Sequence, residues 1–235
     1  MNYRNMKGVS IITCTNRCKN IDFIFSNYAR QLFDKTELII ILNSNDMNLK
    51  KWRKKSENYR DVRIYQCHED KTLGTCKNFA INHTSLEYIA FFDDDDYYGK
   101  NYLCQSINAF DDNKCDVVGK ATCFIYFEKR NTLALFNPNN ENIYASYVMD
   151  SSLVIKRKIF KDISFEDDIQ PETLFQIMCL KRGYKIYSTD RYNYVVHRHY
   201  DPIKEHTWKI SDINLLRYSE IVKRNINSYI EYVDR

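Results

Sequence analysis

Four consecutive aspartates, Asp93 to Asp96, are the residues of this chain whose type and spacing most clearly offer chemistry. They follow the apolar stretch from Tyr88 to Phe92, which is typical of a strand buried on both faces. The carboxylates therefore stand at the carboxyl end of a core strand, the edge where open α/β sheets bind ligands. Crowded carboxylates repel one another unless a cation lies among them. Hard divalent ions suit them, so the pattern predicts a Mg²⁺ or Mn²⁺ site whose remaining positions are filled by substrate phosphates.

A solvated acidic turn is the competing interpretation, because charge runs in soluble proteins are usually solvated. The hydrophobic strand before the aspartates and the aromatic pair Tyr97-Tyr98 after them favour a site instead. Alternate residues of an extended strand share a face, so Asp93 and Asp95 are expected to point together. Asp94 and Asp96 form the rival register.

Polar residues also follow the neighbouring predicted strands. Thr15, Asn16 and Arg17 come directly after the first strand, and Asn43 comes directly after the second. Because the carboxyl ends of parallel strands meet at one edge of a sheet, we expect these side chains to border the same ligand as the aspartates.

A second polar group lies nearer the end of the chain, at His197, Arg198 and His199, followed by His206. It could form a lid in which Arg198 and His206 bind a diphosphate. His206 could also be a third metal ligand, because neutral imidazole often binds metals. The alternative is a set of ordinary surface side chains with Trp208 packed in the core.

The hydrophobic pattern predicts strands and helices in regular alternation over the first hundred residues. Strands are expected over 9–14, 37–42, 62–66 and 88–92, with helices over 21–33, 49–59 and 75–83. This alternation predicts an α/β fold with a mostly parallel sheet and helices on both faces. After Tyr97 the pattern becomes mixed, with a hairpin over 122–136, a helix over 172–181 and a late strand over 192–196.

The last stretch, Ser211 to Val233, has apolar residues at helical spacing and predicts one amphipathic helix. We expect this helix to dock on the rest of the chain or on a second subunit. Lys209, Arg217, Lys223 and Arg224 make peripheral contact with a membrane surface the alternative.

Composition excludes several classes of protein. The chain has 235 residues and a formal net charge of +4, and its basic residues are scattered, so no nucleic-acid footprint is present. The eight cysteines form no C-x-x-C pair, which argues against a cysteine zinc cluster. No apolar run is long enough to span a membrane, and the first residues lack the apolar core of a signal peptide. We therefore expect a cytoplasmic protein, with the inner face of the membrane as an alternative location.

The ordered motifs resemble family 2 glycosyltransferases over roughly residues 8 to 199. The segment Thr13-Cys14-Thr15-Asn16-Arg17 resembles the family's nucleotide-binding opening, and Leu73 to Asn78 resembles its Gly-x-x-x-Arg-Asn segment with Lys77 for Arg. Asp93-Asp94-Asp95 matches its Asp-x-Asp. The stretch from Glu172 to Tyr184 resembles its helix that carries the catalytic base.

The resemblance implies a GT-A fold, with residues 1–210 as one domain and 211–235 as a C-terminal helix. Residues 1–100 would be the nucleotide-binding half and 101–210 the acceptor half. It implies a metal-dependent inverting transferase that moves a sugar from a nucleoside-diphosphate sugar, with UDP expected. The acceptor would be a glycan or a cell-surface polymer, as in the biosynthesis of a cell wall or capsule.

The resemblance also implies roles for single residues. Asp95 would hold Mn²⁺ or Mg²⁺, with Asp93 near the metal or the ribose. The donor would be held by polar and charged side chains, namely Thr13, Thr15, Asn16, Arg17, Asn43, Lys77, Asp94 and Arg198. Glu172 would be the base, with Asp168 in reserve and Asp167 behind it.

Two rival functions remain. A Mg²⁺-dependent phosphohydrolase of the haloacid dehalogenase type also places Asp-x-Asp after a buried strand, although usually after the first strand. A degenerate transferase would only bind a sugar nucleotide or a glycan, and Asn43 and Glu172, which differ from the usual family residues, are compatible with that function.

Overall fold

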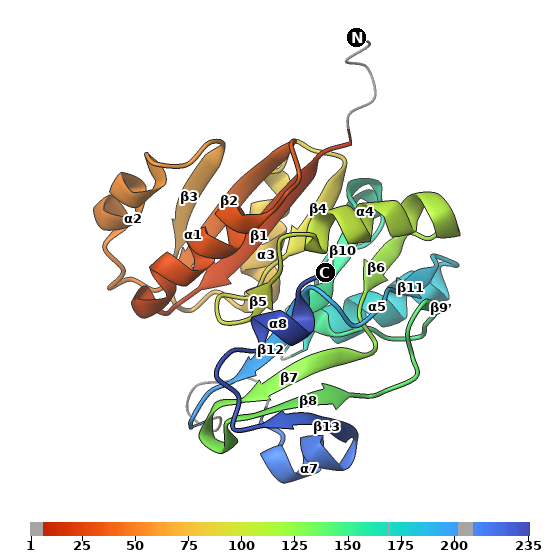
Figure 1. The fold of residues 1–235 in the computed structure, drawn as a ribbon. Coiled ribbons are helices and arrows are strands. Elements are labelled where there is room, and N and C mark those ends of the chain that lie inside the picture. Colours follow the sequence, from red (N-terminus) through yellow and green to blue (C-terminus); the bar gives the residue numbers. More distant parts are fainter. Residues whose placement is uncertain (1–6, 169, 202–208) are drawn as a thin grey trace.

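The computed structural model describes residues 7–168, 170–201 and 209–235. The largest element is an eight-stranded sheet in the order β3-β2-β1-β4-β10-β6-β11-β9 (Figure 1). Its strands are β1 (Val9–Thr15), β2 (Thr36–Asn43), β3 (Val62–Cys67), β4 (Tyr88–Phe91), β6 (Val117–Gly119), β9 (Ile143–Tyr144), β10 (Val154–Lys156) and β11 (Ile186–Ser188).

The predicted parallel core is confirmed. β1 pairs in parallel with β2 and with β4, and β2 pairs in parallel with β3. Beyond β4 the sheet becomes mixed, because β10 runs antiparallel to both of its neighbours. Almost every residue of β2 is buried, as the unbroken apolar run Leu38 to Leu42 requires for a strand covered on both faces.

Helices cover both faces of this sheet. The helices α1, α2 and α4 contribute to one hydrophobic cluster, and α3 and α5 contribute to the cluster on the other side. Trp52 anchors the otherwise basic α2 and is 1% exposed. The helix bounds are α1 (Ile21–Arg30), α2 (Leu49–Ser56), α3 (Leu73–Asn82), α4 (Tyr102–Asn113) and α5 (Pro171–Lys181).

A smaller five-stranded sheet lies below the first in Figure 1, in the order β13-β8-β7-β12-β5. The predicted hairpin forms its centre, with β7 antiparallel to β8. β12 runs parallel to β7 and antiparallel to β5, which follows the four aspartates directly. This sheet therefore places β12 beside the aspartates. Its strands are β5 (Tyr97–Tyr98), β7 (Cys123–Phe127), β8 (Thr132–Phe136), β12 (Tyr194–Arg198) and β13 (Ser219–Arg224).

The predicted C-terminal helix over 211–233 is wrong. The segment forms a short helix α7 (Asp212–Arg217), the edge strand β13 and one last turn α8 (Ile230–Val233). The β-branched pair Ile221-Val222 lies in β13, which pairs with β8, and Asn225 has a positive φ of 52° that a helix cannot contain. Pairing with a distant strand has overridden the local helical spacing.

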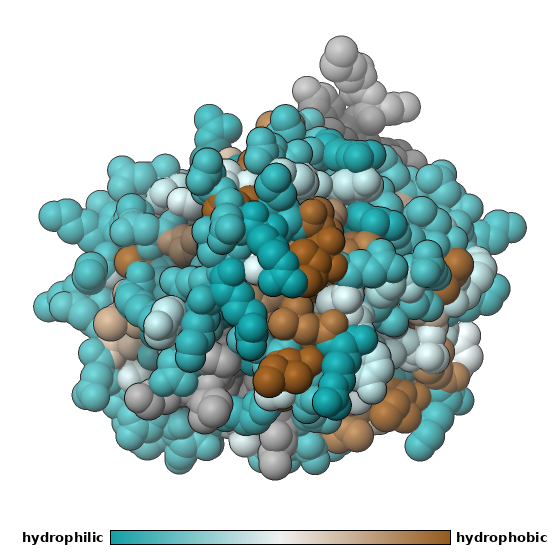
Figure 2. Space-filling model, turned by 60° about the horizontal axis from the view of Figure 1, so that its bottom comes forward, coloured by the Kyte–Doolittle hydropathy of each residue, from teal (hydrophilic) through white to brown (hydrophobic). Residues whose placement is uncertain are grey.

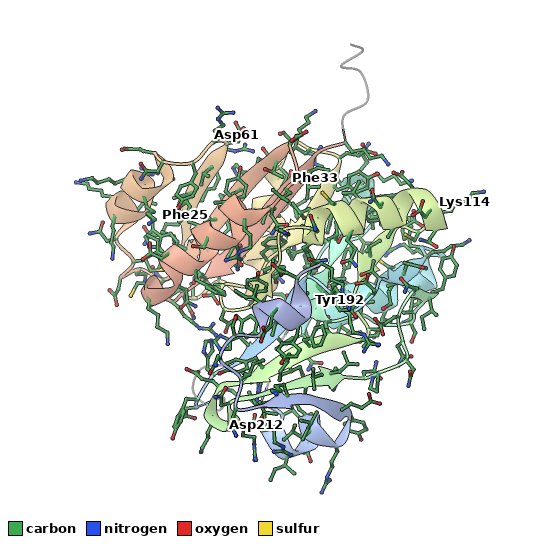
Figure 3. All side chains as sticks on the ribbon, viewed as in Figure 1. Phe25, Phe33, Asp61, Lys114, Tyr192 and Asp212 are labelled. Carbon is green, nitrogen blue, oxygen red and sulfur yellow. The ribbon has the colours of Figure 1, made fainter. Side chains whose placement is uncertain are left out.

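The end of the chain nevertheless docks on the rest of the molecule, as expected. Ile226 and Val233 are buried against the second sheet, and the Asn193 N–H donates to the Val233 carbonyl at 2.9 Å. Arg235 stacks 3.7 Å above the ring of Tyr192, which Figure 3 labels beside α8.

Exposed apolar side chains remain on α7 and β13. Ile213 of α7 is 59% exposed, and Ile221 of β13 is 45% exposed. Figure 2, which turns the bottom of Figure 1 forward, shows brown groups separated by teal side chains rather than one continuous apolar face. Among the described residues, no helix has the length and apolar character needed to cross a membrane.

Candidate functional site

Part of the predicted site lies at the carboxyl edge of the parallel strands, where β1, β2 and β4 end. Thr15 ends β1, Asn43 ends β2, and the aspartates follow β4 after Phe92. Strand β12 approaches this edge from the second sheet. The site therefore lies where the two sheets meet.

Arg17 joins the aspartates to the end of β1. Its guanidinium donates to Asp94 at 2.7 Å and to Asp95 at 2.5 Å, and Asp94 also accepts a hydrogen bond from the Thr15 hydroxyl. Asp94 and Asp95 are each 7% exposed. Arg17 thus supplies the positive charge that two adjacent buried carboxylates require.

The predicted alternation of the aspartates is wrong. Asp94, Asp95 and Asp96 lie in a bend between β4 and β5, so strand periodicity does not apply to them. Asp94 and Asp95 both reach Arg17, whereas Asp96 turns inward. The Asp96 carboxylate accepts from the Tyr194 hydroxyl at 2.7 Å and from the His197 N–H at 3.0 Å. Asp96 therefore fastens β12 to the aspartate bend.

Carboxylate crowding raises the pKa values of this cluster. Burial and the neighbouring Asp95 raise the pKa of Asp94, and the same two causes raise the pKa of Asp96 to about 7. Desolvation by the surrounding protein raises the pKa of Asp93, and the charges of Asp96 and Asp95 raise it further. The charge of Lys77 lowers this pKa but does not prevail. Because the Asp93 side chain is exposed, solvent screens these effects on its pKa. A cation is therefore favoured at the cluster.

The raised pKa values predict how stability changes with pH when no metal is bound. A carboxyl whose pKa is raised on folding keeps its proton in the native state where the unfolded chain has lost it. Stability should therefore fall as pH rises from about 4 to about 7. For each rise of about 1 in the folded-state pKa above the unfolded value, the free energy of unfolding falls by about 1.4 kcal/mol across this pH range. The melting temperature then falls by roughly 3–5 °C. Thermal unfolding in EDTA at pH 5 and pH 7 measures this, and Asp96→Asn should lose part of the difference. An identical pH dependence in Asp96→Asn and wild type would contradict the assignment.

Lys77 and Glu172 form a buried ion pair next to the aspartates. Their side chains are 4% and 8% exposed, and the ammonium also lies 5.0 Å from the centre of the Phe91 ring. Burial would lower the pKa of Lys77, but Glu172 and Asp93 raise it and prevail. Lys77 is therefore a fixed cation between the predicted base and the aspartates.

Asp168 lies apart from this pair. Its side chain is exposed and accepts from the Gln170 N–H at 3.1 Å, just before α5 begins. Asp167 accepts from the Thr72 and Thr75 hydroxyls at the start of α3. Asp167 thus joins the loop before α5 to the start of α3, whereas the contact of Asp168 stays within that loop.

Asp150 is a carboxylate that sequence reasoning missed. It is half-buried and accepts from the Thr173 hydroxyl at 3.1 Å and from the Gln176 amide at 2.8 Å, both on α5. Burial and the charge of Glu172 raise its pKa to about 6. No motif marks Asp150, and the usable signal was a carboxylate a few residues before the buried strand β10.

Three predicted donor-binding residues border the site with different exposure. Thr13 is 2% exposed within β1, whereas Asn16 is exposed beyond its end. The Asn43 amide donates to the His68 carbonyl at 2.9 Å, which fixes its orientation beside β3. Asn16 is therefore more open to solvent than Thr13 or Asn43.

The histidine group is arranged differently from the prediction. His199 lies with its Nε2 atom 3.4 Å from the Asp95 carboxylate, in the place that we expected for His206. His206 lies outside the described residues. Arg198 is 1% exposed and donates to the Ile210 carbonyl at 2.8 Å and to Asp212, labelled in Figure 3. Arg198 thus fastens the C-terminal segment to β12, and its predicted contact with a diphosphate stays a prediction.

The chain matches the glycosyl transferase family 2 model over residues 10–164 and belongs to that family. The fold is GT-A. No curated protein matches the chain.

Solved structures share the fold at low sequence identity. Staphylococcus aureus TarS residues 1–349, in complex with UDP-GlcNAc, superposes with a TM-score of 0.65 and 18% identity over 87% of this chain and 61% of that one. The mannosyltransferase PcManGT from Pyrobaculum calidifontis, in complex with GDP-Man and Mn²⁺, gives 0.63 and 14% over 86% and 59%. The chain thus spans about 60% of the TarS 1–349 and PcManGT chains.

Proposed function

We propose that the chain transfers a sugar from a nucleoside-diphosphate sugar to a hydroxyl of a glycan or cell-surface polymer, with inversion and with a bound Mn²⁺ or Mg²⁺. The observation that carries this proposal is the cluster of three adjacent carboxylates at the sheet edge, with Arg17 and His199 beside Asp95. The aspartate cluster would lie on the leaving-group side of the reaction, and the buried Lys77–Glu172 pair would lie on the acceptor side.

The donor set fits a divalent cation. Asp93 is open to solvent, and Asp95 lies within 3.4 Å of an imidazole nitrogen, so carboxylate oxygen and nitrogen ligands converge. Carboxylates suit Mg²⁺ and Mn²⁺, and imidazole binds transition metals as well. When bound, the ion neutralises charge that develops on the departing diphosphate. Arg17 is placed to add a second positive charge.

The remaining residues position the donor and acceptor. Asn16 and Asn43 border the open side of the edge, where a base and ribose would lie, and an amide can both donate to and accept from a base. UDP is our expected nucleotide. Glu172 is our proposed base, since a carboxylate in reach of the acceptor hydroxyl can take its proton.

A nucleotide-sugar screen by thermal unfolding tests donor binding. A ligand that binds only the native state raises apparent stability, by about 2.7 kcal/mol at a hundred times its dissociation constant. For a chain of this length that is roughly 5–10 °C. We expect UDP-sugars to raise the melting temperature with Mn²⁺ and not with EDTA. If no nucleoside-diphosphate sugar stabilises the chain with metal, the proposal fails.

A further inference from the structure

A second group of metal-ligating side chains stands beside the aspartates, on the end of β12. His197 and His199 are two residues apart in an extended segment, so their side chains share one face. The parallel register pairs His197 with Tyr126 and Arg198 with Phe127. The next residue of the β7 chain, Glu128, therefore comes to lie beside His199.

The side chains of this group converge. One ligand atom each from Glu128, His197 and His199 lies within 4.8 Å of the others. The His199 Nδ1 atom is 3.6 Å from the Glu128 carboxylate, and the two imidazole rings are 4.7 Å apart at their centres. Both histidines are half-buried and Glu128 is exposed, so an ion can reach the group from solvent.

Neighbouring contacts hold two of the three side chains in place. The Tyr200 N–H donates to the Glu128 carboxylate at 2.9 Å. The His197 ring stacks on Tyr126 with 5.4 Å between centres. Side chains held in this way need little rearrangement to bind an ion, because part of their freedom is already lost.

Two imidazoles and one carboxylate form a ligand set for a late first-row transition metal rather than for Mg²⁺. A tetrahedral Zn²⁺ with bonds of about 2.0–2.2 Å holds its ligand atoms about 3.3 Å apart. Small side-chain rotations bring atoms within 4.8 Å to that spacing. We propose that Glu128, His197 and His199 form a Zn²⁺ site with an open fourth position, separate from the aspartate cluster.

His199 links this site to the aspartates. Zinc on its Nδ1 atom leaves Nε2 protonated and facing the Asp95 carboxylate at 3.4 Å, the arrangement in which a carboxylate orients a metal-bound histidine. In that state Nε2 has no lone pair for an ion at Asp95. If the proposed function holds, Zn²⁺ therefore inhibits the Mn²⁺-dependent reaction through His199.

Calorimetric titration of Zn²⁺ into the full chain, freed of metal with EDTA and without nucleotide, tests the site. We expect one ion per chain, with affinity at least roughly tenfold lower in His197→Ala and in Glu128→Gln, the scale of losing a contact that tunes a metal site. Asp95→Asn should lower zinc affinity less than His197→Ala does, because the amide oxygen still accepts from Nε2–H. His68→Ala is the matched control, since His68 is an exposed histidine 2.9 Å from Asp70.

Two results would overturn the site. The first is zinc affinity in His197→Ala and Glu128→Gln equal to that of His68→Ala. The second is a loss of zinc affinity in Asp95→Asn that is as large as the loss in His197→Ala, which would place the ion on the aspartates. Thermal unfolding of each variant separates loss of ligand from loss of fold. Because no nucleotide is present, failure here leaves the proposed transferase function untouched, and failure of that function leaves this result standing.

Discussion

Asp95→Asn is expected to abolish Mn²⁺-dependent binding of UDP while the chain stays folded. Asp95 is the carboxylate that both Arg17 and His199 approach, at 2.5 and 3.4 Å. The substitution keeps the shape and removes the charge that a hard cation requires. Loss of a residue that only supports a metal ligand already costs about 10–100-fold, so we expect a loss of at least about a hundredfold for the ligand itself. Calorimetric titration of UDP with saturating Mn²⁺ measures it.

The matched control is Asp22→Asn. Asp22 is also an aspartate paired with a cation, but its side chain is 78% exposed and its partner is the surface residue Lys55. UDP affinity in Asp22→Asn should equal that of wild type. Asp93→Asn should weaken binding as well. Metal-dependent UDP affinity unchanged in both Asp95→Asn and Asp93→Asn would show that the cluster does not hold the metal.

Glu172→Gln is expected to lower turnover by about 10²–10⁴-fold, the contribution of a general base, with donor affinity unchanged. Glu172 occupies the first turn of α5 and faces Lys77, which also lies near Asp93. The glutamine oxygen can still accept from Lys77, so the variant removes basicity without removing the contact. Single-turnover kinetics with saturating donor and Mn²⁺ separate the chemical step from binding.

Asp168→Asn and Asp150→Asn identify the base if Glu172 is not it. Asp168 is exposed and bound to the Gln170 N–H, so we expect normal turnover when it is replaced. Burial and the charge of Glu172 raise the pKa of Asp150 to about 6, and Asp150 contacts Thr173 in the first turns of α5. Normal turnover in Glu172→Gln together with an inactive Asp150→Asn would move the base to Asp150. An inactive Asp168→Asn would move it to Asp168.

The parallel core and the position of the aspartates could be predicted because they depend on local pattern. The run Leu38 to Leu42 is long enough for a strand and too short for most helices, and each such run ends in polar residues. Parallel strands bring those ends to one edge whatever the detailed packing. The position of the aspartates at this edge of the sheet could therefore be predicted from the sequence.

The partners within the site could not be predicted in the same way. Lys77 and Glu172 are 95 positions apart, and Thr15 and Asp94 are 79 apart. Only the packing of α3 against α5 and of β1 against β4 decides these pairs. The turn of Asp96 toward Tyr194 likewise depends on where the second sheet lies.

Two differences between the sequence pattern and the structure have related causes. Ile221 and Val222 fit a helical apolar stripe, yet β8 offers strand pairing that the local pattern does not record. Arg198 stands between two histidines in sequence, but alternation along the extended chain gives it a different neighbourhood, with Asp212 and Ile210. Alternation also places His197 and His199 together, and that consequence was available from the sequence.

The most direct test of the proposed function is proton and phosphorus NMR of the products that the purified chain forms from a UDP-sugar, with water or an added sugar hydroxyl as the acceptor. The chain is incubated with Mn²⁺ or with EDTA, and Mn²⁺ is removed before the spectra are recorded. We expect release of UDP and formation of a product whose anomeric configuration is inverted, with Mn²⁺ only, and neither in Asp95→Asn. Release that persists undiminished in EDTA, release of inorganic phosphate in place of UDP, or a product of retained configuration would contradict the proposed function.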